Sequence, residues 1–145
     1  MKTAIVYYSK HHGNTKKLLD AIAKNNEVTL IDVTQTPNAD LSGFDRIGFA
    51  SGIYYSKFHK SLLQFMDENL PYDKSVFFLY TYGAKKKGYT EAAAQAAKSK
   101  NAEILGSFGC FGFNTYGPFK VIGGITKGHP DSSELANAVA FYEGL

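Results

Sequence analysis

Two patterns of hydrophobic and polar positions alternate along the chain. Short runs that are almost continuously apolar are typical of strands buried on both faces of a parallel sheet. Such strands are expected at residues 4–8, 27–33, 46–50, 76–80 and 104–113. Between these runs, apolar residues recur every three or four positions, which predicts amphipathic helices. The expected helices follow residue 15, span about 57–68 and 90–100, and follow residue 130.

The regular alternation of strand and helix predicts an α/β fold, a five-stranded parallel sheet with helices on both faces. The 145 residues are expected to form a single domain, because they are enough for one hydrophobic core and show no internal repeat or low-complexity linker. The last helix has a clear start signal. Asp131 and Glu134 have the spacing of an N-cap and its capping-box partner.

Composition and charge narrow the function classes. The net charge of +3 comes without a long basic stripe, so binding to nucleic acid is not expected. No apolar run approaches the ~20 residues of a membrane helix, and no signal-peptide pattern follows Met1. The single cysteine, Cys110, excludes an internal disulfide and is expected to be a buried small hydrophobe. These features predict a cytoplasmic protein without membrane insertion.

Candidate chemistry is concentrated in the loop between the first strand and the first helix. A helix N-terminus offers unpaired N–H groups and the positive end of the helix dipole, so a polar loop at that point can bind a phosphate. A glycine lets the backbone approach an anion closely. The alternative is an ordinary turn with a polar cap at Asn14 or Thr15. The candidate residues are Ser9, Lys10, His11, His12, Gly13, Asn14 and Thr15.

Two further loops are expected at the same edge of the sheet, because the carboxyl ends of parallel strands meet there. Both combine glycine with hydroxyl and aromatic side chains, and tyrosine rings can stack on a flat ligand. One follows the third strand, with Ser51, Gly52, Ile53, Tyr54 and Tyr55. The other follows the fourth strand, with Thr81, Tyr82, Gly83, Gly88 and Tyr89, and it also contains the basic run 85–87.

The first loop lacks the G-x-x-x-x-G-K-[ST] pattern of a P-loop and the G-x-G-x-x-G pattern of a dinucleotide site. It resembles the phosphate loop of flavodoxins, commonly T-x-T-G-x-T or S-x-T-G-N-T. Ser9, Gly13, Asn14 and Thr15 match, whereas His11 and His12 stand where one threonine is usual. The stretches 50–59 and 106–138 also resemble small flavodoxin-like proteins. The resemblance implies a doubly wound sheet of order 2-1-3-4-5.

The same resemblance implies function. It implies that FMN binds with its phosphate at residues 9–15 and its ring between the two later loops, and that Gly52 provides the peptide that reorients when the flavin is reduced. It implies an electron carrier that works with redox partner proteins, a reductase and an acceptor. The alternative is a flavodoxin-fold oxidoreductase acting on a quinone or a porphyrinogen. A phosphoacceptor receiver domain is disfavoured, because Ser9, Ala50 and Ser51 stand where it needs acidic residues.

Three side-chain expectations complete the prediction. Tyr54 or Tyr55 is expected to cover the flavin, since the chain has no tryptophan. His59 is expected on the surface of a helix beside Phe58. The basic run 85–87 either points to solvent or lies near the flavin, where cations would make its reduction easier and would attract an acidic partner.

Overall fold

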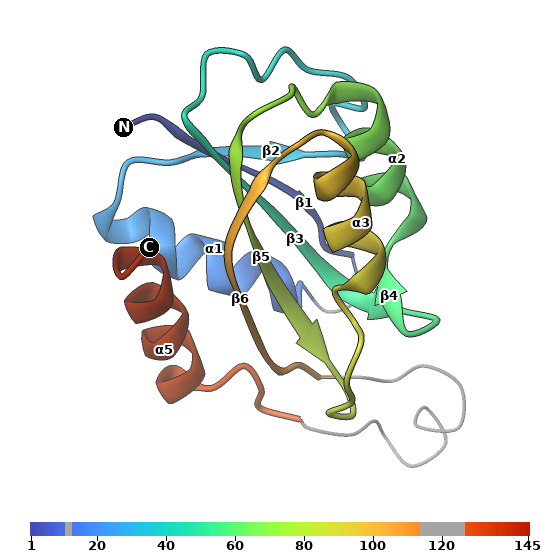
Figure 1. Cartoon of the computed structure of the whole chain (residues 1–145). Coiled ribbons are helices and arrows are strands. Elements are labelled where there is room, and N and C mark those ends of the chain that lie inside the picture. The colour runs from blue at the N-terminus through green and yellow to red at the C-terminus, as the bar shows by residue number, and fades with distance from the viewer. Residues whose placement is uncertain (11–12, 114–126) are drawn as a thin grey trace.

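The computed structural model describes residues 1–10, 13–113 and 127–145. Its centre is a parallel sheet in the order β2-β1-β3-β5-β6 (Figure 1). The short strand β4 (Lys57–Phe58) pairs antiparallel with the end of β3. The parallel strands are β1 (Thr3–Tyr8), β2 (Thr29–Asp32), β3 (Arg46–Tyr54), β5 (Ser75–Tyr82) and β6 (Glu103–Phe111). With β4 set aside, this is the predicted order 2-1-3-4-5, so the fold prediction is confirmed.

Helices cover both faces of the sheet (Figure 1). One face carries α1 (Asn14–Asn25) and α5 (Ser132–Glu143), which pack against each other. The other face carries α2 (Lys60–Asn69) and α3 (Glu91–Ser99), also in mutual contact. This is a doubly wound arrangement, in which all loops that leave the carboxyl ends of the strands lie at one edge. Among the described residues, no helix is both long and apolar enough to span a membrane.

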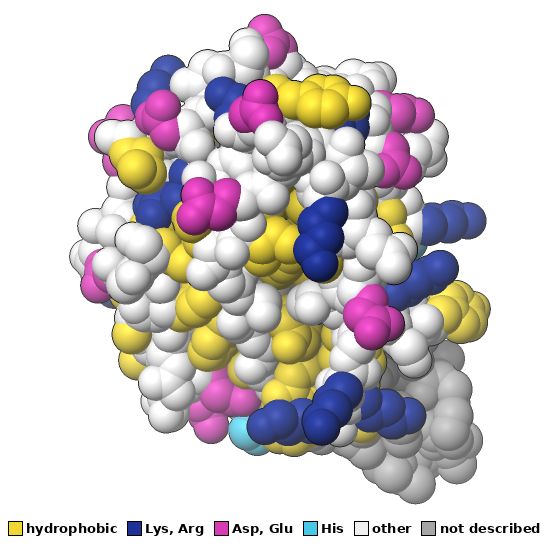
Figure 2. Space-filling view, viewed as in Figure 1, with side chains coloured by type: hydrophobic (Ala, Val, Ile, Leu, Met, Phe, Trp, Pro, Cys, Tyr) yellow, Lys and Arg dark blue, Asp and Glu magenta, His cyan; other side chains and the backbone are white. Residues whose placement is uncertain are grey.

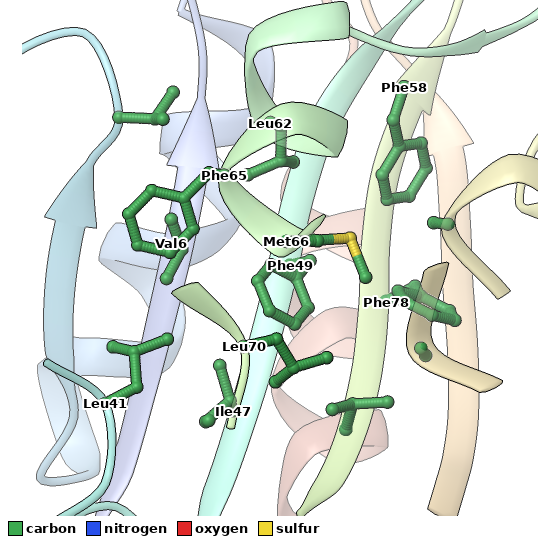
Figure 3. Packing of buried hydrophobic residues seen from close by; sticks show 14 residues of the cluster. Val6, Leu41, Ile47, Phe49, Phe58, Leu62, Phe65, Met66, Leu70 and Phe78 are labelled. Atoms are coloured by element: carbon green, nitrogen blue, oxygen red, sulfur yellow. The ribbon is translucent and has the colours of Figure 1, made fainter. Parts of the chain in front are cut away.

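Each face of the sheet has its own core. The larger core lies between the sheet and the pair α2 and α3, where Phe49, Phe65, Met66 and Phe78 are almost fully buried (Figure 3). Full burial of each such side chain stabilises the fold by about 1.5–3 kcal/mol. The smaller core, beneath α1 and α5, includes Phe77. Successive side chains of β5, such as Phe77 and Phe78, therefore point into opposite cores, and the strand is buried on both faces. The loops of the cleft extend from these buried strands.

The largest departure from the predicted boundaries lies between the third strand and the second helix. The third strand continues to Tyr54 and turns back through β4, whereas residues 51–56 were expected to form a loop. The second helix therefore begins at Lys60 and not near 57. Pairing of Ile53 with Phe58 accounts for both differences, because Phe58 is fully buried while it extends the sheet. The fourth parallel strand also extends, so Thr81 belongs to it.

Candidate functional site

A cleft lies at the carboxyl ends of β1, β3, β5 and β6 and encloses about 360 Å³, partly open to solvent. It brings together side chains and backbone from all three loops that the sequence singled out. The predicted residues that line it are Ser9, Lys10, Asn14, Thr15, Gly52, Ile53, Tyr54, Thr81, Tyr82 and Gly83. Gly112 and Phe113, which follow β6, complete the lining and were not predicted.

The start of α1 has an unusual N-cap and an unusual charge pattern. Gly13 is the N-cap, and its φ of 64° lies in the left-handed region that favours glycine. It has no side chain with which to cap the helix, and neither Asn14 nor Thr15 is the cap; instead, Ser9 Oγ accepts from the backbone N–H of Lys16 at 3.0 Å. The first turn holds no acidic residue and instead carries Lys16 and Lys17. A helix dipole disfavours cations there, and an anion at the N-terminus would offset that cost.

Two buried polar side chains fix this loop to its neighbours. Thr15 Oγ1 and Thr81 Oγ1 share a hydrogen bond of 3.0 Å between the first turn of α1 and the end of β5. Asn14 Nδ2 donates to the carbonyl of Phe113 at 2.7 Å. Asn14 Oδ1 is buried, and no group among the described residues donates to it. A buried acceptor without a donor is costly, so a ligand that donates a hydrogen bond to Asn14 Oδ1 would remove this cost.

The end of β3 is held by a serine that the sequence placed in the binding loop. Ser51 is fully buried, donates from Oγ to the Gly52 carbonyl at 2.5 Å and accepts from the backbone N–H of His59 at 3.1 Å. Ser51 therefore does not line the cleft but orients the peptide that does. At Gly52, an added Cβ would make an ordinary van der Waals contact of 3.4 Å with the Tyr54 ring, so this contact does not require glycine.

An aromatic cluster packs against Tyr54, one of the residues that line the cleft. The His59 ring stacks on Tyr8 with centroids 3.7 Å apart, and Tyr54 meets both rings edge-on. His59 is also the N-cap of α2, because its Nδ1 accepts from the Ser61 N–H at 3.1 Å. Burial, with a smaller contribution from Lys60, lowers the pKa of His59. The expectation of a surface histidine within a helix is wrong, because the hairpin at residues 53–58 places this ring before the helix and against Tyr8.

The loop after β5 is closed by its own tyrosine. Tyr89 is buried, and its hydroxyl donates a hydrogen bond to the carbonyl of Ala84 at 2.5 Å. This bond joins the two ends of the loop. Tyr82 lies half-buried in the lining with its ring edge-on to Phe111, and burial raises the pKa of its hydroxyl. The exposed lysines at 85–87 lie outside the lining. This loop therefore offers the cleft Tyr82 and Gly83 and presents its basic run to solvent.

Of the other predicted residues that the structure describes, Gly13, Tyr55 and Gly88 also lie outside the lining of the cleft. Tyr55 is 98% exposed at the tip of the hairpin, and Gly88 has a φ of 88° in the turn before Tyr89. The positions of His11 and His12 lie outside the described residues. Gly112 could have been predicted from topology alone, because the last strand ends at the same edge. A Cβ there would lie 2.7 Å from the Asn14 side chain, so glycine is required for that contact.

A polar network ties the end of β6 to α5. The predicted capping box of Asp131 and Glu134 is present. Glu134 also accepts from the Phe111 N–H at 3.1 Å and is hydrogen-bonded to His129 Nδ1, so its carboxylate is fully used within the fold. Nearby, Cys110 is buried as expected, and burial raises the pKa of its thiol to about 12.

Comparison with known proteins gives concordant results. A family model described as a flavodoxin domain matches residues 5–116. A protein of Methanocaldococcus jannaschii described as uncharacterized is 36% identical over 147 residues, which cover all of this chain and 98% of that protein. A solved flavodoxin from the domain Archaea has a TM-score of 0.67 at 20% identity, with 98% of this chain and 97% of that one covered. An NADPH-quinone reductase from P. pentosaceus has a TM-score of 0.65 at 14% identity, with 97% of both chains covered. The two structural likenesses show the shared fold.

Proposed function

The chain belongs to the flavodoxin domain family and is a flavodoxin-type flavoprotein, and from this premise we propose that it binds FMN in the cleft and carries electrons between redox proteins. The observation that supports this most is the convergence of three separate loops on one cleft whose inner end is a helix N-terminus without an acidic residue. A phosphomonoester meets the needs of that N-terminus.

The residues fit the two ends of FMN. At the phosphate end, the backbone N–H groups of Asn14 and Thr15 and the ammonium of Lys10 are available, whereas the Lys16 N–H is already bonded to Ser9. The ribityl chain has hydroxyl groups that can donate to the buried Asn14 Oδ1. At the ring end, Gly52 and Gly83 let the backbone approach a flat ligand closely, and Tyr54 and Tyr82 present aromatic surface.

Bound FMN supplies reversible electron transfer, and this chain's residues supply orientation and exclusion of water. The Ser51 hydroxyl holds the Gly52 carbonyl, and the bond between Thr15 and Thr81 keeps the phosphate loop in register with β5. The described lining contains neither a carboxylate nor a histidine that could exchange a proton with a substrate, and its Tyr82 hydroxyl has a raised pKa. Because the flavin itself would carry the chemistry in a carrier and in a quinone-reducing enzyme alike, this composition does not separate the two classes, and an assay has to do so.

Titration of the apoprotein with FMN and with riboflavin tests the proposal. We expect FMN to bind at least tenfold more tightly, since only FMN carries the phosphate, and flavin fluorescence to fall on binding. Equal affinity for the two flavins would contradict the phosphate site. A steady-state assay with NADPH and a soluble quinone then separates the two classes. Rapid turnover without a partner protein would favour the alternative, a quinone-reducing oxidoreductase like the P. pentosaceus neighbour of the same fold.

A further inference from the structure

We propose that the surface around the mouth of the cleft is a docking site for an acidic redox protein, with Tyr55 as its aromatic anchor and a rim of lysines as its charge. This inference rests on the proposed electron-carrier function and adds the chemistry of the partner. The lysines, called the basic rim below, are Lys10, Lys57, Lys60, Lys85, Lys86 and Lys87.

The basic rim is placed by the segments that form the cleft. Lys10 belongs to the lining itself, and Lys57 pairs with Tyr54, which lines the cleft, across the hairpin. Lys60 follows His59, whose ring touches Tyr54. The run 85–87 leaves the lining directly after Gly83 and Ala84. In Figure 2, dark blue side chains gather along the lower edge of the molecule, near the point where β5 ends in Figure 1.

These lysines are not used within the fold. All six are exposed, and none takes part in a salt bridge among the described residues. Lys16, by contrast, is paired with Asp20 one turn along α1. The acidic groups near this edge, among the described residues, include Asp32 at the end of β2, Glu91, and the pair Asp131 and Glu134 at the start of α5, so the six lysines still outnumber them. The edge therefore keeps a positive surplus, which accelerates encounter with an acidic surface at low ionic strength.

Tyr55 offers an aromatic contact to the partner protein, in addition to the charges of the basic rim. It and Ser56 form a two-residue hairpin turn in which both residues have positive φ, 52° and 66°. Turns of this kind favour Asn-Gly, and a bulky residue there is a conformational outlier. The turn nevertheless presents a tyrosine that is 98% exposed beside the cleft. Exposed tyrosines surrounded by polar groups are typical hot spots of protein interfaces.

The charge chemistry favours a protein over a nucleic acid. Every cation of the basic rim is a lysine, and the single arginine, Arg46, lies at the opposite edge with its guanidinium over Tyr142. Arginine is the side chain that recognises phosphate groups bidentately, whereas lysine is a strongly hydrated point charge. Hydrated charges around one aromatic residue suit a transient encounter that is fast to form and fast to dissociate.

Electron transfer to two haem proteins of opposite charge tests the proposal. The FMN-loaded protein is reduced with dithionite and mixed with ferric cytochrome b5, which is acidic, or with ferric cytochrome c, which is basic. Each transfer reduces one ferric haem to ferrous, so one fully reduced protein reduces two haems in succession. We expect the second-order rate constant to be larger for cytochrome b5 and to fall about tenfold or more between low and high salt.

Two charge variants share the same change in net charge. Lys57→Glu with Lys86→Glu is expected to lower the cytochrome b5 rate constant roughly tenfold. Lys24→Glu with Lys98→Glu places the same charges in the last turns of α1 and α3, at the far edge, and is expected to lower it about twofold or less. Equal losses in the two variants, or a faster reaction with cytochrome c, would overturn the docking site.

The Tyr55 anchor has its own test. Tyr55→Asn with Ser56→Gly keeps the turn and removes the ring, so we expect several-fold weaker saturation by cytochrome b5, with unchanged oxidation by ferricyanide and unchanged FMN affinity. Weaker FMN binding would place Tyr55 in the cofactor site and overturn its role as an anchor. Rim-dependent binding of a labelled single-stranded oligonucleotide at physiological salt would overturn the protein partner. Failure to bind FMN at all would appear first in the flavin titration and would remove both proposals.

Discussion

The two edges of the sheet both contain residues in the left-handed conformation, but they use different side chains for it. At the amino edge these are Asp73 and Asn101, with φ of 65° and 53°, and Asn101 donates to Asp73 at 2.6 Å. Aspartate and asparagine tolerate this conformation well. At the carboxyl edge the non-glycine residues of this kind are Tyr55 and Ser56, alongside the glycines Gly13 and Gly88. Where only a turn is needed, the chain uses residues suited to the turn, so the tyrosine at the other edge indicates a second requirement.

Polar groups show the same contrast. At the amino edge, Lys74 Nζ donates to the carbonyls of Ser42 and Phe44, both at 2.8 Å, so this charge is used within the fold. At the carboxyl edge the lysines of the basic rim lie outside any salt bridge among the described residues, and Asn14 Oδ1 lacks a donor there. Lys24 and Lys98 of the amino edge also lie outside any salt bridge among the described residues, so the clearest difference between the edges is the buried Asn14 acceptor beside the cleft.

Gly13→Asp should produce the largest change of the substitutions considered, a loss of FMN affinity. The substitution introduces a side chain at positive φ and a carboxylate where the phosphate is expected, so FMN affinity should fall roughly 100-fold, or ~2.7 kcal/mol. Isothermal titration calorimetry measures it. Gly128→Asp is the control, because Gly128 also has positive φ and open space around its Cβ position but does not line the cleft. Similar losses in both variants would mean that strain, and not the anion site, explains the effect.

Breaking the buried pair of threonines should have the next largest effect. Thr15→Val leaves the hydroxyl of Thr81 buried without its partner, and we expect a loss of about 1–3 kcal/mol in the free energy of unfolding. Urea denaturation of this variant, of Thr81→Val and of the double variant measures the coupling. The double variant should be more stable than the sum of the two losses indicates. Strict additivity would show that the two hydroxyls are satisfied independently, for example by water.

Relieving the hairpin should have a smaller effect of opposite sign. Tyr55→Asn with Ser56→Gly replaces two unfavourable residues by the favoured pair, and left-handed backbone costs an ordinary residue about 1–2 kcal/mol. Thermal denaturation should show a stabilised protein. Asn101→Gly at the other edge should bring no gain, because it removes the bond to Asp73. A hairpin variant no more stable than the parent would contradict the idea that strain is retained at this edge.

The smallest expected effect is the pH dependence of His59. Burial lowers its pKa in the folded state, so below about pH 6.5 the unfolded chain binds a proton that the folded protein does not. The free energy of unfolding should therefore decrease as the pH falls from about 6.5 toward the folded pKa. His59→Asn keeps an acceptor for the N-cap, and denaturation curves at several pH values should show a flatter profile. An unchanged profile would assign the dependence to other groups.

The sequence was sufficient for the fold because the signals there are local. Short continuous apolar runs such as 76–80 are typical of buried strands, and their alternation with helices leads to a doubly wound sheet. The capping box at Asp131 is also a local signal. The cleft followed from topology, because the carboxyl ends of parallel strands share one edge.

What the sequence did not reveal depends on contacts between distant residues. The hairpin was missed because Tyr55-Ser56 lacks the Asn-Gly signal and because Phe58 continues the helical spacing of Leu62 and Phe65. The stacking of His59 on Tyr8 joins two segments that no local pattern connects. Ser51 was correctly placed near the cleft, but its inward hydrogen bonds became visible only with the hairpin present.

The burial of Cys110 has a practical consequence for chemical labelling. It is the single cysteine of the chain, and its thiol pKa of about 12 leaves very little reactive thiolate at neutral pH. Maleimide and iodoacetamide reagents should therefore leave the folded protein unmodified. A cysteine introduced in place of Lys86 or Lys98 would be the one reactive thiol of the molecule. Fluorophores or crosslinkers could then be attached at either edge of the sheet without first removing a native residue.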